Sequence, residues 1–320
     1  MLSMIIIISL LLDAIIGEPR RWHPLVGFGN LAIGCEQKLN NKNTQSQIKL
    51  RVLGLFAWTV VVLPLVIGVY FLEQLCSTYK IVFDSGIQIG FDVFVAIIFL
   101  SLAIGAKSLV QHASAVESAL NKNNLDLARQ RIAMIVSRDT AKSDEAAINR
   151  ATIESVLENG SDAIFAAIFW FTILGVPGVV LYRLTNTLDA MWGYRTERFQ
   201  YFGWAAARID DVMNWLPARL TAFSYALAGN TKSALQCWFT QAKHWHGINP
   251  GVVMASGAGA LQIKLGGKAF YHKQEIERPD LGLGNKAETK DIKRAIQIVQ
   301  RSIVIWVLSI VIINTVNSTL

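Results

Sequence analysis

Three carboxylates recur at helical spacing in one polar segment of the chain. Glu154, Glu158 and Asp162 follow one another every four residues in the stretch 151–162, which is rich in helix-forming residues. On an α-helix they would share one face, where like charges destabilise the helix by about 0.2–0.5 kcal/mol per pair. We therefore expect a cation opposite this face, namely Mg²⁺, a substrate amine or an arginine. The alternative is a solvated acidic surface without chemical function.

A second group of reactive side chains lies in the block 185–219. Asp211 is three residues from both Arg208 and Asn214, and Asp210 is four residues before Asn214. One helical turn would therefore gather acid, amide and guanidinium groups. Carboxylate oxygens suit Mg²⁺, which bridges phosphates, and arginine binds phosphate or carboxylate through two parallel hydrogen bonds. The alternative is a set of structural ion pairs that holds a helix at the membrane surface.

Several common catalytic motifs are missing from the sequence. It contains no P-loop, no Gly-x-Ser-x-Gly and no His-Glu-x-x-His, so any ATP site is not of the Walker type. His23 precedes a proline in a tryptophan-flanked turn, where a structural role is the commoner one and a catalytic role is the alternative. The three cysteines are isolated, which indicates neither a disulfide framework nor a zinc site.

The composition indicates that these side chains are positioned by membrane helices. The chain is 52% apolar and 17% charged, with a mean hydropathy of +0.38, whereas soluble domains are about 25% charged. A helix of about 20 apolar residues spans the hydrocarbon of a bilayer. The segments expected to span are Val52–Leu72, Ile87–Ala106, Ala163–Tyr182 and Ser302–Thr315. Met1–Ile16 is shorter, and we expect a retained first helix rather than a cleaved signal peptide.

One of these segments is interrupted by Gly175-Val176-Pro177-Gly178. If it spanned fully, the arginines of 185–219 would lie opposite the loop 107–162, against the tendency of basic residues to remain cytoplasmic. A segment that breaks or turns back removes the conflict, since irregular backbone is tolerated where it lines a protein cavity. The prediction is an all-α, polytopic integral membrane protein. It has about 4–5 membrane helices, one broken or re-entrant segment, helical cytoplasmic loops and almost no β-structure.

The net charge of +7 is concentrated between the apolar segments. This pattern predicts a multi-pass protein of the cell (inner) membrane with its active site facing the cytoplasm. We expect a single membrane-embedded domain over 1–320, with cytoplasmic catalytic loops 17–51, 107–162, 185–219 and 230–300. Cationic loops beside membrane helices are ordinary, so membrane lipid is an expected partner and nucleic acid is not, while an anionic substrate fits the charge.

Long blocks of the sequence resemble the CbiB or CobD family of cobalamin biosynthesis. The opening Gly-Glu-Pro…His-Pro at 17–24 is similar to that family's Gly-Asp-Pro…His-Pro, and the segment 138–162 is similar to its central motif. The segment 178–220 also resembles the family, through Asn186-Thr187-Leu188-Asp189 and Ala206-Ala207-Arg208…Asp210-Asp211. The chain departs from the pattern around Asn249-Pro250-Gly251, where Met254 stands in the position of a glutamate.

The resemblance implies an adenosylcobinamide-phosphate synthase. Such an acid–amine ligase uses ATP, with Mg²⁺, to join the carboxylate of adenosylcobyric acid to aminopropanol phosphate or a similar amino-alcohol phosphate. The expected catalytic residues are Glu158, Asp162, His23 and Asp211. The expected substrate- or phosphate-binding residues are Arg138, Asn159, Asn186, Arg198, Arg208, Arg219 and Asn249. The expected metal ligands are Glu154, Asp189 and Asp210.

The sequence is also compatible with further partners and with two other functions. A homo-oligomer, or contact with other corrinoid-assembly enzymes, would extend the partners beyond the corrinoid and amino-alcohol phosphate substrates. A non-catalytic membrane sensor or regulator, similar to the AmpE proteins, is the alternative function. A corrinoid transporter is weaker, because the apolar helices carry almost no charge beyond Asp13 and Asp92.

Overall fold

A computed structural model of the chain describes residues 1–18, 24–40, 46–82, 88–271 and 274–319. Four of its helical segments are long and apolar enough to cross a membrane: Gln47–Ser77, Phe91–Asn121, Glu145–Trp192 and Thr289–Asn317. Each overlaps one of the four predicted spans, and the shorter first helix is also present. The prediction of an all-α, polytopic membrane protein is confirmed.

The described residues form two compact units, each assembled from two stretches of the sequence. Unit 1 comprises Met1–Gly105 with Ala166–Asn214, and unit 2 comprises Ala106–Phe165 with Trp215–Leu320. The single membrane-embedded domain over 1–320 stays a prediction.

Unit 1 is a group of apolar helices with one small hairpin. Its elements are α1 (Leu2–Ile15), α2 (Pro24–Leu39), α3 (Gln47–Ser77), β1 (Lys80–Val82), β2 (Gln88–Gly90), α4 (Phe91–Ala103), α8 (Ala166–Trp192) and the first part of α9 (Trp204–Ala228). The core joins α2, α3 and α8 through buried residues such as Phe28, Val62 and Leu188. Trp192 and Phe202 pack edge to face in it, with ring centroids 5.2 Å apart. This core fixes the C-terminal end of α8, where the polar residues of the unit lie.

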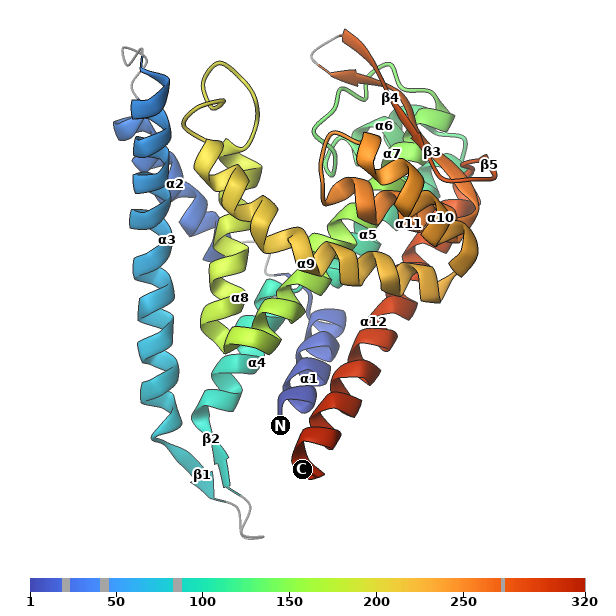
Figure 1. Cartoon of the computed structure of the whole chain (residues 1–320). Helices are drawn as coiled ribbons and strands as arrows, with labels where there is room; N and C mark the ends of the chain where they lie inside the picture. Colours follow the sequence, from blue (N-terminus) through green and yellow to red (C-terminus); the bar gives the residue numbers. More distant parts are fainter. Residues whose placement is uncertain (19–23, 41–45, 83–87, 272–273, 320) are drawn as a thin grey trace. The chain divides into compact units, whose positions relative to one another are not determined.

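The predicted break in the third apolar segment is confirmed at Gly175 of α8. Gly175 has φ +65° and ψ −149°, a combination that is essentially restricted to glycine. In a straight helix Trp170 and Gly178 would be about 12 Å apart along the axis. A Cβ placed on Gly178 would instead lie 2.4 Å from the carbonyl oxygen of Trp170. The chain therefore folds back on itself, and Figure 1 shows the two arms of α8 meeting at this bend.

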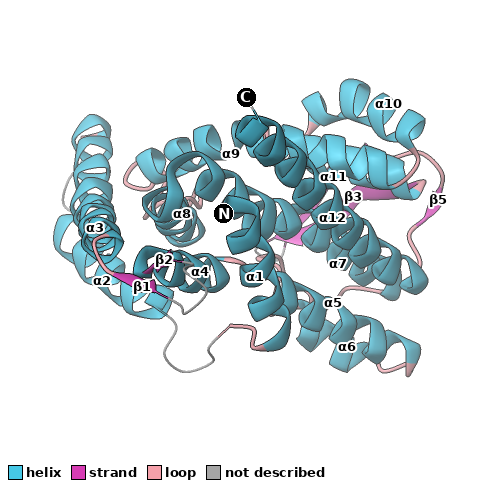
Figure 2. Ribbon diagram, turned by 90° about the horizontal axis from the view of Figure 1, so that it is seen from below, coloured by secondary structure: helices cyan, strands magenta, loops and turns pink. Residues whose placement is uncertain are grey.

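Unit 2 surrounds one buried helix. Its helices are α5 (Ala106–Asn121), α6 (Leu125–Ile132), α7 (Glu145–Gly160), a π-helical turn (Ser161–Phe165), the second part of α9, α10 (Thr231–Gln241), a 3₁₀ turn (Ala242–His244), α11 (Pro250–Leu261) and α12 (Thr289–Thr319). Every residue from Gly251 to Leu261 in α11 is buried. Figure 2 shows α11 between α10 and α12. A Cβ on Gly257 would lie 2.6 Å from the Leu157 side chain, so a small residue is needed there for α7 and α11 to approach.

The expectation of almost no β-structure is wrong in the block 230–300. β3 (Ile263–Tyr271) and β4 (Gln274–Leu281) pair antiparallel, and β5 (Asn285–Lys286) pairs parallel to β3. Ile263, Leu265 and Ala269 are buried at alternating positions of β3, which is the period of a strand with one covered face. The alternation escapes sequence analysis because Gly266 and Gly267, both with positive φ, interrupt it at a shift of the strand register.

The bend in α8 should depend on the absence of a side chain at residue 175. We predict that Gly175→Ala lowers the free energy of unfolding by about 1–3 kcal/mol, because alanine is strained at this backbone conformation. Gly68→Ala in α3 is the control, since its added Cβ would meet nothing within 4 Å beyond its chain neighbours and the backbone of its own helix, and alanine is the better helix former. Melting temperatures of both variants in the same detergent measure the effect. Equal melting temperatures would show that the bend is not held by Gly175.

Candidate functional site

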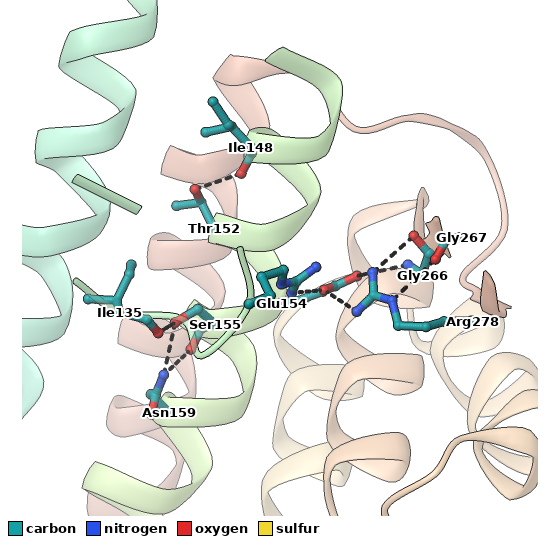
Figure 3. A network of polar contacts seen from close by, with 10 residues as sticks. Ile135, Ile148, Thr152, Glu154, Ser155, Asn159, Gly266, Gly267 and Arg278 are labelled. Atoms are coloured by element: carbon teal, nitrogen blue, oxygen red, sulfur yellow. Dashed lines mark hydrogen bonds and ion pairs between the residues drawn. The ribbon is translucent and has the colours of Figure 1, made fainter. Parts of the chain in front are cut away.

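Glu154 is the centre of a buried ion cluster in unit 2, formed with Arg138, Arg278 and the backbone of Gly266. The side chain of Glu154 is 2% exposed and that of Arg278 is 6% exposed. Arg278 donates from Nη1 to Oε2 over 2.9 Å and from Nη2 to Oε1 over 3.1 Å. Arg138 also donates to Oε2, and the Gly266 N–H donates to Oε1 over 2.9 Å. Figure 3 shows the Glu154 side chain reaching from α7 to Arg278 and the glycine pair of β3.

These contacts identify the cation that faces the predicted acidic helix. A carboxylate offers about four acceptor positions, and the donors described for Glu154 fill that number. The opposing cation is therefore a pair of arginines, one of the alternatives given by the sequence. The metal role predicted for Glu154 and the phosphate role predicted for Arg138 gain no support from this arrangement, because each group already satisfies the other.

The predicted single face of three acids is divided in the structure. α7 ends at Gly160 and continues into the π-helical turn Ser161–Phe165, which winds more residues per turn than an α-helix and is common at functional sites. Asp162 lies in this turn, while Glu158 remains on α7, and both are partly buried. Asn159 donates to the carbonyl and hydroxyl oxygens of Ser155, each over 2.9 Å.

The structure brings together two predicted residues that are distant in the sequence, Arg219 of α9 and Asn249 before α11. Arg219 Nη1 donates to Asn249 Oδ1 over 3.2 Å and to the Trp215 carbonyl oxygen over 2.6 Å. The guanidinium also lies 4.2 Å from the centre of the Trp215 ring. Asn249 is buried, so this pair places a partly buried guanidinium beside the N-terminus of α11.

Asp210 is the centre of a hydrogen-bonded cluster in unit 1 that also contains Tyr182, Asn186 and Asn214. The Asn186 amide donates to Oδ1 of Asp210 over 3.2 Å, and the Asn214 amide donates to Oδ2 over 3.0 Å. Asn214 Oδ1 in turn accepts from the Tyr182 hydroxyl over 2.9 Å. α8 and α9 are thereby joined through polar side chains. Burial raises the pKa of Asp210 to about 6, although the two amide donors act in the opposite direction.

Asp211 and Arg208 form the ion pair expected from their spacing. Arg208 Nη1 lies 2.8 Å from Asp211 Oδ2, and the two side chains are 50% and 33% exposed. Burial raises the pKa of Asp211, and the positive charges of Arg208 and Arg195 oppose that change. The grouping of acid, amide and guanidinium on one turn of α9 is therefore confirmed as geometry.

The oxygen donors of unit 1 suit Mg²⁺ better than Glu154 does. Each oxygen of Asp210 accepts one hydrogen bond and so retains a further acceptor position. Asp189 follows Asn186 by one helical turn and is partly buried. Among the described residues, no group of three or more His, Cys, Asp or Glu side chains could hold a metal ion. Mg²⁺ often uses only one or two carboxylates with substrate phosphates and water, so Asp210 with Asp211 or Asp189 fits that mode.

The remaining predicted site residues are Arg198 and His23. Arg198 donates from Nε to Oε1 of buried Glu36 over 3.0 Å and from Nη2 to Oε2, while Asn40 donates to Glu36 over 2.7 Å. Arg198 thus neutralises an acid of α2, which gives no support to its predicted phosphate role. His23 lies outside the described residues.

Comparison with known proteins assigns the chain to a protein family. The family model described as CobD/Cbib protein matches residues 6–299. The chain belongs to the CobD/CbiB family. A protein named Cobalamin biosynthesis protein CobD from Chromobacterium violaceum is 50% identical over 301 residues, which cover 93% of this chain and 92% of the relative. The protein of that name from Stutzerimonas stutzeri is 50% identical over 300 residues, 94% of each chain.

More distant members of the CobD/CbiB family also match along most of their length. The Mycobacterium tuberculosis protein of the same name is 33% identical over 296 residues, covering 91% of this chain and 89% of the relative. No solved structure matches. The range matched by the CobD/CbiB model contains both the Glu154 cluster and the Asp210 cluster.

The raised pKa of Asp210 gives a prediction about stability. Its ordinary pKa is 3.8 and its folded pKa is about 6, so the folded state resists ionisation. Stability should fall as the pH rises from about 4 through 6 and then level off. The difference corresponds to on the order of 3 kcal/mol. Asp210→Asn should lack this loss.

Melting temperatures between pH 4 and 8 measure the predicted loss. Asp126→Asn is the control because this acid lies on α6 with an 86% exposed side chain, and its profile should follow that of the natural protein. Parallel profiles for the natural protein and Asp210→Asn would contradict the prediction.

Proposed function

We propose that the protein is an adenosylcobinamide-phosphate synthase. It would join the carboxylate of adenosylcobyric acid to the amine of aminopropanol phosphate, or of a similar amino-alcohol phosphate, at the expense of ATP. The observation that carries this proposal is the match to the CobD/CbiB family over residues 6–299, together with 50% identity to full-length cobalamin biosynthesis proteins.

The reaction requires activation of a poor electrophile. A carboxylate resists attack by an amine until one of its oxygens becomes part of a leaving group. Transfer of the γ-phosphoryl group of ATP to that oxygen would give an acyl phosphate and ADP. The amine nitrogen then attacks the acyl carbon, the C–N bond forms, and phosphate leaves with the carbon–oxygen electron pair. The protein must bind phosphate oxygens, orient the two substrates and accept a proton from the amine.

Within each unit, the side chains described above suit some of these tasks. Arg208 in unit 1 and Arg219 in unit 2 each present a guanidinium that suits phosphate oxygens. Asp210 and Asp211 of α9, with Asp189 of α8, are the residues that would hold Mg²⁺. When bound, this ion neutralises charge on the transferring phosphoryl group. Glu158 and Asp162, both in unit 2, are the carboxylates that we assign to accepting the proton of the amine.

A regulatory membrane protein related to AmpE is the alternative. A sensor needs neither arginines that bind phosphate nor a buried acid such as Asp210, whose oxygens retain further acceptor positions. The enzyme is favoured because α9 carries the Arg208–Asp211 ion pair and, beside it, the buried acid Asp210. Purified protein supplied with ATP, Mg²⁺, adenosylcobyric acid and aminopropanol phosphate tests the choice. Formation of adenosylcobinamide phosphate supports the ligase, and its absence from folded protein contradicts it.

We also propose that the polar loops face the cytoplasm, where ATP is available. Asn121 and Thr196 are both exposed and belong to loops that are predicted to be cytoplasmic. Single cysteines at these positions, in a variant without the natural cysteines, should both react with an impermeant maleimide only in inverted membrane vesicles. Reaction of either one in right-side-out vesicles would overturn this orientation.

The acids at the end of α7 should be needed for turnover but not for folding. We predict that Glu158→Gln and Asp162→Asn each lower the rate of amide formation at least about a hundredfold, the value of a positioned proton-transfer group. The melting temperature should hold, because the neutral amide keeps the shape of the side chain and removes repulsion from neighbouring acids.

Glu145→Gln is the matched control for these variants. This exposed residue lies in the first turn of the same helix and accepts only a 3.1 Å hydrogen bond from Thr289 among its described contacts. Its rate should remain near that of the natural protein. Full activity of both Glu158→Gln and Asp162→Asn would show that these acids have no role in the reaction.

The Arg208–Asp211 pair gives a separate prediction. If the pair binds phosphate or Mg²⁺, its variants should change the rate of the reaction, whereas variants of a structural ion pair should change only the melting temperature. Arg208→Lys keeps the charge but loses bidentate hydrogen bonding to phosphate, so the KM for ATP should rise about tenfold. Asp211→Asn should raise the Mg²⁺ concentration needed for half-maximal rate, and excess Mg²⁺ should restore most of the rate. Lower melting temperatures with normal rates per folded molecule would show that the pair only stabilises α9.

A further inference from the structure

A polar groove lies between α5 and α12 of unit 2, outside the clusters described above. Its cavity volume is about 470 Å³, and all its lining residues except Ile296 are polar. This volume is in the range of sites for small molecules. The polar residues recur at helical spacing on both sides, Ser114, Glu117 and Asn121 on α5 and Lys293, Gln297 and Gln300 on α12. Two packed helices thus turn polar stripes toward one cavity.

The groove contains charges of both signs that do not neutralise one another. Glu117, Lys122 and Lys293 all line it. In the described part of the chain, no ion pair within 4.0 Å joins any two of them, although neighbouring residues of α12 do pair, as Arg294 does with Asp291 at 2.7 Å. Glu117 is partly buried, and the two lysines are exposed. A ligand that carries an anion and a cation at opposite ends would satisfy all three groups.

We infer that this groove binds the amino-alcohol phosphate substrate, an assignment that rests on the proposed function. Lys122 and Lys293 bind the phosphate group, and Glu117 binds the ammonium group. The amide side chains of Asn121 and Gln297 supply neutral hydrogen bonds for the phosphate ester oxygen between them. Both helices of the groove pack against α7, the helix that carries Glu158.

The charge pattern favours this ligand over the other two substrates. ATP carries no cationic group for Glu117. The corrinoid is far larger than 470 Å³ can enclose, and its reacting carboxylate would meet Glu117 as a like charge. A small phosphate ester with a primary amine matches both the size and the signs of charge.

Calorimetric titration of the full-length protein in lipid nanodiscs with 1-amino-2-propanol phosphate tests the assignment. Lys293→Gln should weaken binding about tenfold, which is the value of one charge-assisted hydrogen bond. Lys290→Gln is the matched control, since Lys290 lies on the same helix, outside the groove lining, and pairs with Glu288 at 2.6 Å. Its affinity should equal that of the natural protein.

A second ligand separates the two ends of the groove. Hydroxypropyl phosphate has the phosphate group but no amine. Glu117→Gln should weaken binding of the amine ligand and leave binding of hydroxypropyl phosphate unchanged, whereas Lys293→Gln should weaken both. Equal affinities for the natural protein and Lys293→Gln, at unchanged melting temperature, would overturn the assignment, as would the absence of binding to the natural protein.

The failure of this inference and the failure of the proposed function give different results. If the natural protein forms adenosylcobinamide phosphate but Lys293→Gln retains its KM for the amino-alcohol phosphate, the groove assignment is wrong and the ligase stands. If Lys293→Gln and Glu117→Gln show the expected binding pattern but the natural protein forms no amide, the groove assignment stands as a phosphorylated-amine site and the ligase is wrong.

Discussion

The enclosure of the Glu154 carboxylate is the constraint on which the packing of unit 2 depends. An ionised carboxylate that leaves water costs several kcal/mol unless its acceptor positions are filled. Arg278 fills two of those positions from a strand that is 124 residues distant in sequence, and Arg138 and the Gly266 N–H fill the others. α7, the segment before it and the β3–β4 pair are therefore held in one arrangement.

This arrangement also sets what the nearby helices can do. Because α7 is anchored at Glu154, the direction of Glu158 one turn later is fixed, and the π-helical turn then changes the direction of Asp162. Tyr225 of α9 supports this turn by donating to the Leu157 carbonyl oxygen over 3.0 Å. In unit 1 the bend at Gly175 has a similar effect, because it aims the second arm of α8, with Asn186, at Asp210 of α9. In both units a structural feature therefore sets the direction of an acid that we assign to the proposed reaction.

Local spacing allowed part of this account to be predicted from sequence. The Arg208–Asp211 and Asp210–Asn214 contacts follow from helical periodicity, and the bend in α8 follows from two glycines and a proline in an apolar run. The partners of Glu154 and Arg198 could not be predicted in the same way. Arg278 lies in a strand whose alternation is broken by glycines, and Glu36 lies 162 residues from Arg198. Nothing in the spacing of a single sequence identifies such distant pairs. The sequence therefore indicated that Glu154 needs a cation, but not which one.

The contacts of Glu154 make it an anchor neutralised by arginine, and we expect that it does not bind Mg²⁺. The most direct measurement compares the melting temperatures of Glu154→Gln, Arg278→Gln and the double variant, each with and without Mg²⁺. We expect each single variant to lose stability, by about 3–5 kcal/mol for an orphaned buried charge. The double variant should lose much less than the sum of the two, and Mg²⁺ should change none of these differences. Additive losses, or stabilisation by Mg²⁺ that disappears in Glu154→Gln, would contradict this expectation.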